Sequence, residues 1–267
     1  MKDITGTTRL FYIVGHPIAQ VRTPQVLNAW FRREALDAVM VPTHVKPEGL
    51  RSVFEAFRHT QNLDGFIVTV PHKAEALLLC DEVTPAARAI GAVNAVRRTS
   101  DGRLIGDMFD GRGFVAGLQS QGHDPAGKSV LIVGAGGAAA AIAHAFAAAD
   151  VQRLSISNRT HSKAQEMADR VRSHHPLITI DATENDPTGY DIVVNATSLG
   201  MADGDPLPFD IEKLSTDTLV AEVIMKPEMT ALLCAAQTRG CPIHLGRHML
   251  EHQSLLMGRY MTGQTVD

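Results

Sequence analysis

The chain has 267 residues, of which 45% are hydrophobic and 20% are charged, which is an ordinary balance for a globular protein in water. Its formal net charge of −4 gives no sign of a basic surface, so we do not expect a nucleic-acid partner. The three cysteines lack CxxC spacing, and no apolar run reaches the ~20 residues that span a membrane. We therefore expect a cytoplasmic protein with reduced thiols and no membrane contact.

Short apolar runs alternate with helical patterns through the first half of the chain. This β–α rhythm predicts a mainly parallel sheet covered by helices on both faces. The expected strands are 10–14, 39–45 and 65–70, the expected helices are 24–33, 48–58 and 73–79, and a strand pair follows at 92–96 and 104–106.

The second half shows the same alternation, beginning at Ser129. Neither a repeat nor a proline-rich linker separates the halves, so motifs place the hinge near 111–113 and a return crossing near Gly246. The expected strands are 129–133, 153–157, 178–180, 191–195 and 219–224; the expected helices are 137–148, 162–172, 229–239 and 249–260, the last after a short run at 242–245.

A glycine-rich turn lies halfway along the chain, between the apolar run 130–133 and an alanine-rich helix. A strand, a tight glycine turn and a helix in this order are typical of a dinucleotide-binding unit, because the backbone can approach a pyrophosphate and the helix start offers free N–H groups. A turn without a ligand would show the same pattern. The residues expected to hold the cofactor here are Gly134, Gly136, Gly137 and Ala138.

The end of the next expected strand favours NADP over NAD. NAD sites usually place a carboxylate there, whereas this chain has Asn158, Arg159 and Thr160, with Lys163 one turn further on. A guanidinium can bind a 2′-phosphate through paired charged hydrogen bonds. The alternative is a solvated helix start, although cations there oppose the helix dipole unless an anion binds.

Two further polar positions follow the strand expected at 191–195. Asn195 and Thr197 stand where a doubly wound sheet faces its ligand crevice, so they are candidates for the nicotinamide side. The same residues also suit an ordinary strand exit.

The first half carries candidate proton-transfer groups at element ends. Lys73 follows the strand expected at 65–70, and Asn94 and the segment 107–111 end the next expected elements. A lysine and a carboxylate near one crevice could exchange the proton of a secondary alcohol. At strand ends such residues are more often simply solvated.

Taken together, these motifs resemble the shikimate dehydrogenase family along nearly the whole chain. The likeness implies an α/β protein in which an N-terminal substrate domain (residues 1–112 plus 246–267) accompanies a Rossmann-type NADP domain (residues 113–245), with the C-terminal helix returning to the first domain. It is carried, in order, by Gly15–Ala19, Val68–Lys73, Gly91–Asn94, Asp107–Gly111, Gly134–Ala138, Asn158–Thr160 and Asn195–Thr197.

The resemblance also implies roles. Lys73 and Asp110 correspond to the family's proton-transfer pair, and the implied reaction is reversible hydride transfer between NADP(H) and a ring carbon of a small-molecule substrate, shikimate or a related cyclic acid. The implied substrate-binding residues are Thr23, Thr69, Asn94 and Gln253.

The match departs from the family where the substrate carboxylate is held. Val21 and Met225 stand where the family has a serine and a tyrosine, and only Thr23 keeps a hydroxyl. A hydrogen bond to a charged group contributes about 1.5–3 kcal/mol, so two losses predict roughly 10²- to 10⁴-fold weaker use of shikimate.

This departure leaves other functions open. They are a quinate- or aminoshikimate-directed dehydrogenase, a non-catalytic regulator on the same scaffold, and a folate-type dehydrogenase. Met108 and Phe109 replace more polar family residues, and they either make the crevice wall apolar or turn into the core.

Several remaining features are given no chemistry. We expect no metal site, because the pair His248 and His252 lacks a third ligand. Oligomeric state is left as monomer or homodimer. His72 is expected to be structural, His174 and His175 solvated, and Asp107 a turn residue.

Overall fold

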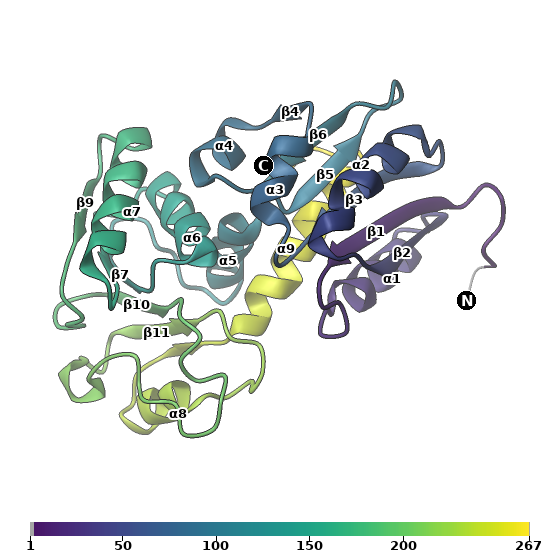
Figure 1. Cartoon of the computed structure of the whole chain (residues 1–267). Coiled ribbons are helices and arrows are strands. Elements are labelled where there is room, and N and C mark those ends of the chain that lie inside the picture. Colours follow the sequence, from purple (N-terminus) through teal and green to yellow (C-terminus); the bar gives the residue numbers. More distant parts are fainter. Residues whose placement is uncertain (1–2, 267) are drawn as a thin grey trace. The chain divides into compact units, whose positions relative to one another are not determined.

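The computed structural model describes residues 3–266, which form two compact units (Figure 1). The first unit runs to Phe109 and resumes at Gln253, and the second unit runs from Asp110 to His252. Within residues 3–266, no helix combines the length and apolar character needed to cross a membrane. Helices alternate with the strands of two sheets, one in each unit, so the expected α/β architecture is confirmed.

The first unit is built on a mixed six-stranded sheet with the order β2-β1-β3-β5-β6-β4. β1 pairs in parallel with β2 and β3, whereas β5 runs antiparallel to both β3 and β6. The carboxyl ends of β1 and β3 therefore share one edge. The strands are β1 (Arg9–Gly15), β2 (Ala38–His44), β3 (Leu63–Val68), β4 (Glu82–Val83), β5 (Ala95–Arg98) and β6 (Leu104–Asp107).

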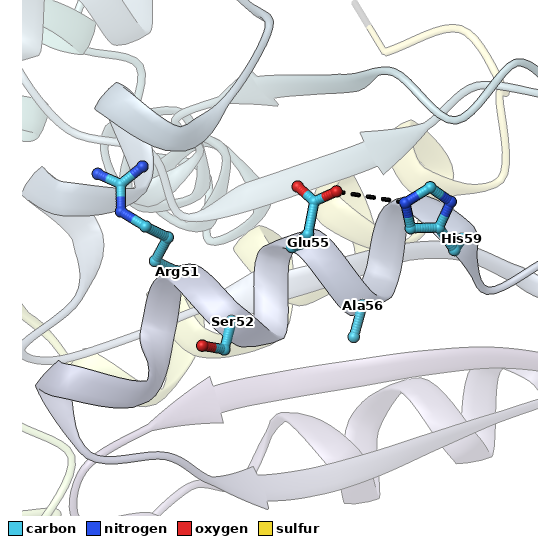
Figure 2. A pocket seen from close by; sticks show the side chains of 5 residues that line it. All are labelled: Arg51, Ser52, Glu55, Ala56 and His59. Atoms are coloured by element: carbon cyan, nitrogen blue, oxygen red, sulfur yellow. Dashed lines mark hydrogen bonds and ion pairs between the residues drawn. The ribbon is translucent and has the colours of Figure 1, made fainter.

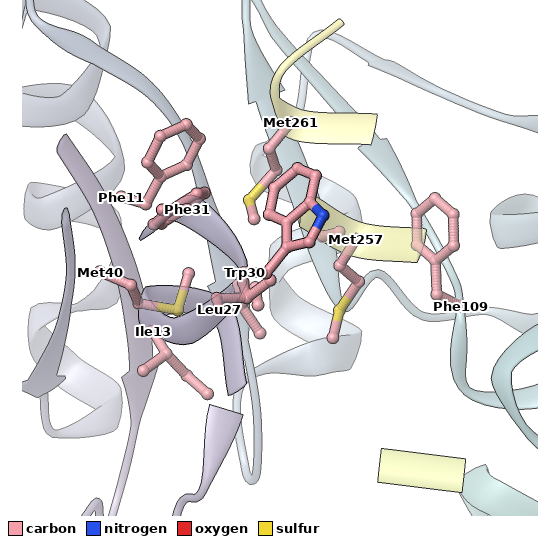
Figure 3. Packing of buried hydrophobic residues seen from close by; sticks show 11 residues of the cluster. Phe11, Ile13, Leu27, Trp30, Phe31, Met40, Phe109, Met257 and Met261 are labelled. Atoms are coloured by element: carbon pink, nitrogen blue, oxygen red, sulfur yellow. The ribbon is translucent and has the colours of Figure 1, made fainter. Parts of the chain in front are cut away.

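Helices of the first unit bury an aromatic and methionine-rich core. Trp30 of α1 lies beside Met257 and Met261 of α9 in Figure 3, and Phe109 belongs to the same buried cluster. The C-terminal part of α9 therefore completes this core. The helices of this unit are α1 (Thr23–Arg33), η1 (Pro47–Gly49), α2 (Leu50–His59), α3 (Lys73–Leu79) and α4 (Pro85–Ile90); α9 (Gly246–Met261) spans both units.

The second unit is built on a six-stranded sheet with the order β12-β11-β10-β7-β8-β9, in which every pairing is parallel. The order turns back at β7, which is where doubly wound sheets bind ligands at their carboxyl edge. The strands are β7 (Ser129–Val133), β8 (Arg153–Ser157), β9 (Thr179–Ala182), β10 (Ile192–Asn195), β11 (Leu219–Glu222) and β12 (Ile243–His244).

One helix of the second unit has a glycine-rich start. α5 begins at Asp110, and a Cβ added at Gly111 would lie 2.5 Å from the carbonyl carbon of Ala141 and 2.9 Å from the Cβ of Ala145. Because only glycine fits there, α5 and α6 pack in close contact. The helices of this unit are α5 (Asp110–Ser120), α6 (Gly137–Ala148), α7 (His161–His174), η2 (Ile211–Lys213) and α8 (Ala231–Thr238).

Candidate functional site

Backbone hydrogen bonds of the first unit bring together three segments with candidate chemistry. Val93 N donates to the carbonyl of Lys73 (2.9 Å), and Asn94 N donates to the carbonyl of Asp107 (3.0 Å). The buried Asn94 side chain accepts a hydrogen bond from Phe109 N through its Oδ1 (2.9 Å). Asn94 therefore links the start of α3 to the chain that leads into Asp110.

The two proposed proton-transfer residues each occupy the first position of a helix. Lys73 opens α3 directly after the carboxyl end of β3 and is half-buried. Asp110 opens α5 with only 4% of its surface exposed. Both residues take part in further interactions, and Asp110 is too deeply buried to be a freely solvated charge.

A second loop lies on this edge of the first sheet. Thr69 N donates to the carbonyl of Val14 (2.9 Å), and a Cβ added at Gly15 would lie 2.5 Å from the Thr69 methyl carbon. His72 is buried, and its Nε2 donates to the carbonyl of Val45 (2.8 Å). The interpretation of His72 as a structural residue is confirmed, and its anchorage fixes the turn that precedes Lys73.

The remaining candidates for substrate binding are partly or wholly covered. Thr23 is 5% exposed at the first position of α1, and Val21 packs against the apolar core of the first unit. Gln253 on α9 has a buried Oε1 atom with no hydrogen-bond partner among residues 3–266. A buried carbonyl oxygen without a donor is costly, so it suits a ligand that brings a hydroxyl.

The glycine turn of the second unit has the geometry that a pyrophosphate requires. Gly134 has φ +122° and its N–H donates to the carbonyl of Ser157 (2.8 Å), which places it at the carboxyl edge beside β8. Nothing would contact a Cβ at Gly136 or Gly137, and both are exposed. No side chain caps α6, which leaves the N–H groups of its first turn, including that of the half-buried Ala138, available to an anion.

The basic segment after β8 is exposed next to that turn. Val133 and Ser157 are register partners in β7 and β8, so both loops leave the same edge. Asn158 Nδ2 donates to the carbonyl of Thr160 (2.9 Å) and shapes the loop. Arg159, Thr160 and Lys163 are all exposed at the start of α7. These residues fit a 2′-phosphate nucleotide.

The position of Asn195 departs from the expectation that it lines the crevice. It has no exposed surface, and its Nδ2 donates to the Leu199 carbonyl and to Glu222 Oε1, both at 2.9 Å. Its Oδ1 accepts hydrogen bonds from Thr197 N (3.1 Å) and Thr197 Oγ1 (2.7 Å). Asn195 is therefore saturated within the protein and holds the loop instead of facing a ligand.

Glu222 is a buried acid that sequence reasoning missed. Its two carboxylate oxygens accept hydrogen bonds from Asn195 Nδ2 and from Thr230 Oγ1 (2.8 Å). Burial raises its pKa, and the two hydrogen bonds oppose that rise. The only signal in the sequence was an acidic residue closing an otherwise apolar strand.

The structure changes two other expectations, for Asp107 and His175, and decides between the two alternatives for Met108 and Phe109. Asp107 ends β6 instead of forming a turn, and its Oδ1 accepts hydrogen bonds from Thr84 Oγ1 and Met108 N. Met108 and Phe109 are both buried, with Phe109 against Tyr260, so the core interpretation is correct. His175 is half-buried, and its Nε2 lies 3.3 Å from Nδ1 of the buried His144, because α6 and α7 pack together.

The surface hollow drawn in Figure 2 is lined by none of these residues. It holds about 500 Å³ over one face of α2 and is lined by Arg51, Ser52, Glu55, Ala56 and His59. Its one internal contact is the exposed pair Glu55 and His59 (3.2 Å). Among residues 3–266 no group of three or more acidic, histidine or cysteine side chains is arranged to hold a metal ion.

Comparison with known proteins agrees with this geometry. Residues 13–96 match the shikimate dehydrogenase substrate binding domain, and residues 118–201 match the family described as shikimate / quinate 5-dehydrogenase. A relative from Rubrobacter xylanophilus named shikimate dehydrogenase (NADP(+)) is 38% identical across 99% of this chain and 94% of its own length. The chain belongs to the shikimate dehydrogenase family.

Solved structures of the family share the fold over nearly the full chain. Shikimate 5-dehydrogenase from Listeria monocytogenes, in complex with shikimate and NAD, superposes with a TM-score of 0.92 at 31% identity, covering 100% of this chain and 96% of that one. The ligand-free 5-ketofructose reductase of Gluconobacter sp. strain CHM43 superposes with a TM-score of 0.90 at 35% identity, covering 97% and 95%. Proteins of this architecture therefore carry different named substrates.

Proposed function

We propose that this protein is an NADP-dependent oxidoreductase that interconverts a secondary alcohol and a ketone on shikimate or a related cyclic acid. The observation that carries the proposal is the set of hydrogen bonds that joins Lys73, Asn94 and the segment leading to Asp110. Curated relatives that span the chain are named shikimate dehydrogenase (NADP(+)), which supports the same cofactor and substrate.

The second unit supplies the residues that would hold NADP. The exposed backbone of Gly136 and Gly137 and the uncapped start of α6 suit the pyrophosphate, while Arg159 and Lys163 suit the 2′-phosphate. The nucleotide held there would supply the hydride chemistry, as NADP+ in the oxidative direction and as NADPH in the reductive direction. The protein's part is to orient the nucleotide; the chain after β8 offers Asn158 and Arg159 to the ribose, where a carboxylate would repel a 2′-phosphate.

The first unit supplies the proton chemistry. Lys73 Nζ takes the proton of the reacting hydroxyl in the oxidative direction and returns it in the reductive direction, and Asp110 orients and balances that charge. Asn94 and Thr69 hold ring hydroxyls. The unpartnered Oε1 of Gln253 accepts a hydrogen bond from a further hydroxyl, which satisfies a buried oxygen.

The test is NADPH formation followed by absorbance with shikimate, comparing Lys73→Ala with Lys46→Ala. Lys46 is an exposed lysine of the same unit outside the site. We expect Lys73→Ala to lower kcat by about 10²- to 10⁴-fold and Lys46→Ala to leave it unchanged. Equal activity of both variants, or no turnover by a wild-type protein that binds NADP+, would refute the proposal.

A second candidate is reduction of a ketone that carries no carboxylate. Val21 packs its side chain into the core, and Met225 exposes 47% of an apolar side chain after β11, so neither position offers a hydroxyl to an anion. The neighbour at 35% identity is named 5-ketofructose reductase, which makes a neutral keto sugar a specific alternative.

The two candidates predict opposite preferences. NADPH oxidation should be measured with 5-ketofructose beside shikimate oxidation, in wild type and in Val21→Ser with Met225→Tyr. If the missing hydroxyls matter, the double variant gains roughly 10²- to 10⁴-fold in kcat/KM for shikimate. Efficient shikimate use by wild type, unchanged in the variant, would eliminate the keto-sugar candidate.

The organisation proposed for the molecule follows from these roles. We assign substrate binding to residues 1–112 with 246–267 and NADP binding to residues 113–245, in a cytoplasmic protein that is a monomer or a homodimer. Light scattering of the purified protein measures the oligomeric state directly.

A further inference from the structure

Glu222 forms a buried polar network that the proposed chemistry does not use. It closes β11 with no exposed surface, and each carboxylate oxygen accepts one hydrogen bond, from Asn195 Nδ2 (2.9 Å) and from Thr230 Oγ1 (2.8 Å). An ionised carboxylate only accepts hydrogen bonds, so it suits two donors that converge on it. Such bonds are stronger than neutral ones in a water-free surrounding.

Each donor organises a different loop. Asn195 also fixes the loop 196–200, through Leu199 O (2.9 Å) and both the N–H and the hydroxyl of Thr197. Thr230 caps α8 by accepting a hydrogen bond from Leu233 N (3.2 Å), which ends the loop 223–229. Glu222 thus ties the two loops to one point.

The loop 196–200 lies directly against the glycine turn. Ala196 N donates to the carbonyl of Val133 (2.8 Å), and a Cβ added at Gly134 would lie 2.8 Å from the Ala196 carbonyl oxygen. Both loops follow strands whose carboxyl ends share an edge with β7. Movement of the network would therefore change the wall next to the bound dinucleotide.

We infer that Glu222 is a positioning residue for hydride transfer. As a buried carboxylate it holds the loops 196–200 and 223–229 against the glycine turn, where the nicotinamide half of NADP would lie. The inference rests on the proposed function. Glu222 should therefore contribute to the binding free energy of the nicotinamide half of NADP and not to that of the adenosine half, which would lie next to Arg159.

The experiment compares Glu222→Gln with Glu212→Gln. Glutamine keeps the size of the side chain but presents an N–H group to one of the two donors, whereas Glu212 is 77% exposed and pairs with Arg239 on the surface. Calorimetry measures binding of NADP+ and of 2′,5′-ADP, which lacks the nicotinamide half. Hydrogen exchange measures protection of the Thr197 and Leu199 amides.

We expect Glu222→Gln to weaken NADP+ binding about tenfold and to speed exchange at both amides. The affinity of Glu222→Gln for 2′,5′-ADP should stay within about twofold of wild type, and Glu212→Gln should leave the affinity for both nucleotides unchanged. Thr230→Val removes one of the two donors, together with the cap of α8, and presents no mismatched N–H to Glu222; it should give the same selective loss at smaller size.

An equal loss for both nucleotides, or no loss and unchanged exchange, would overturn the positioning role. If Glu222→Gln does not fold, Thr230→Val decides the question. A selective loss of NADP+ binding in Thr230→Val then supports the positioning role, and the absence of that loss overturns the role. Wild-type protein that binds neither nucleotide would refute the proposed function, and the positioning role with it.

Discussion

Substitution of Gly111 by alanine should damage both stability and catalysis, because this glycine sets the distance between α5 and α6. The added methyl group would lie 2.5 Å from the carbonyl carbon of Ala141, whereas ordinary contact begins at 3.4 Å. The obstacle is backbone of a packed helix and cannot rotate away. The two helices must therefore separate by roughly 1 Å.

The opposing effects have different sizes. Alanine favours a helix over glycine by about 1 kcal/mol, and overpacking a rigid site costs about 3 kcal/mol or more. The cost of overpacking exceeds the gain in helix propensity, which leaves a net destabilisation of about 2 kcal/mol. A destabilisation of this size lowers the Tm of a protein of this length by about 4–8 °C. Asp110 precedes Gly111 and α6 begins the proposed pyrophosphate site, so a shift of this size should also lower kcat about 10²-fold.

Differential scanning fluorimetry and NADPH absorbance measure the two effects. Gly6→Ala is the control, because nothing lies within 4 Å of a Cβ there. A Gly111→Ala protein with the same Tm as Gly6→Ala and an unchanged kcat would refute the reasoning.

Three further predictions concern charge and proton transfer. Arg159→Ala with Lys163→Ala should raise the Kd for NADP+ about 10- to 100-fold and leave that for NAD+ within about twofold, measured by fluorescence titration; equal losses would refute a 2′-phosphate site. Lys73→Arg should lower kcat nearly as far as Lys73→Ala in steady-state assays, because an arginine does not release its proton; retained activity would remove the proton-transfer role. Burial, and then the charges of His175, His174 and Arg170, lower the pKa of His144 to about 4. The unfolded chain takes up this proton near pH 6.5 and the folded protein does not, so the free energy of unfolding is highest above pH 6.5 and falls by about 3 kcal/mol toward pH 4. Urea titrations should show a smaller fall in His144→Leu, and an identical slope would contradict this origin.

Much of the fold could be predicted because hydrophobic periodicity is local. The strands 129–133 and 153–157 and the helices 73–79 and 137–148 have the predicted bounds. Helix α5 was missed because Gly111, Gly113 and Gly117 lower helix propensity, and the close packing that favours them is a tertiary property. The pairing of β5 with β6 was expected, whereas the antiparallel pairing of β5 with β3 depends on a distant strand that no local pattern reveals.

The candidate site divides in the same way. Motifs located Lys73, Asp110, the glycine turn and Arg159, since each stands at an element end with a distinctive neighbour. Asn195 was placed at the correct edge but with the wrong exposure, because its hydrogen bonds depend on Glu222, 27 residues further along the chain. A single buried carboxylate has no periodicity and cannot be recognised until its donors are in place.

The passage of α9 into the first unit has a consequence for the order in which the protein matures during synthesis. Met257 and Met261 complete the core around Trp30, and Met261 also packs on Gly65, yet both are synthesised after the whole of residues 110–252. Until Met257 and Met261 have been made, the apolar surface that they cover in the first unit stays exposed. Residues 110–252, by contrast, contain every strand of the second unit's parallel sheet. The second unit can therefore fold before the first unit is complete, and during that interval the first unit is the part that needs a chaperone.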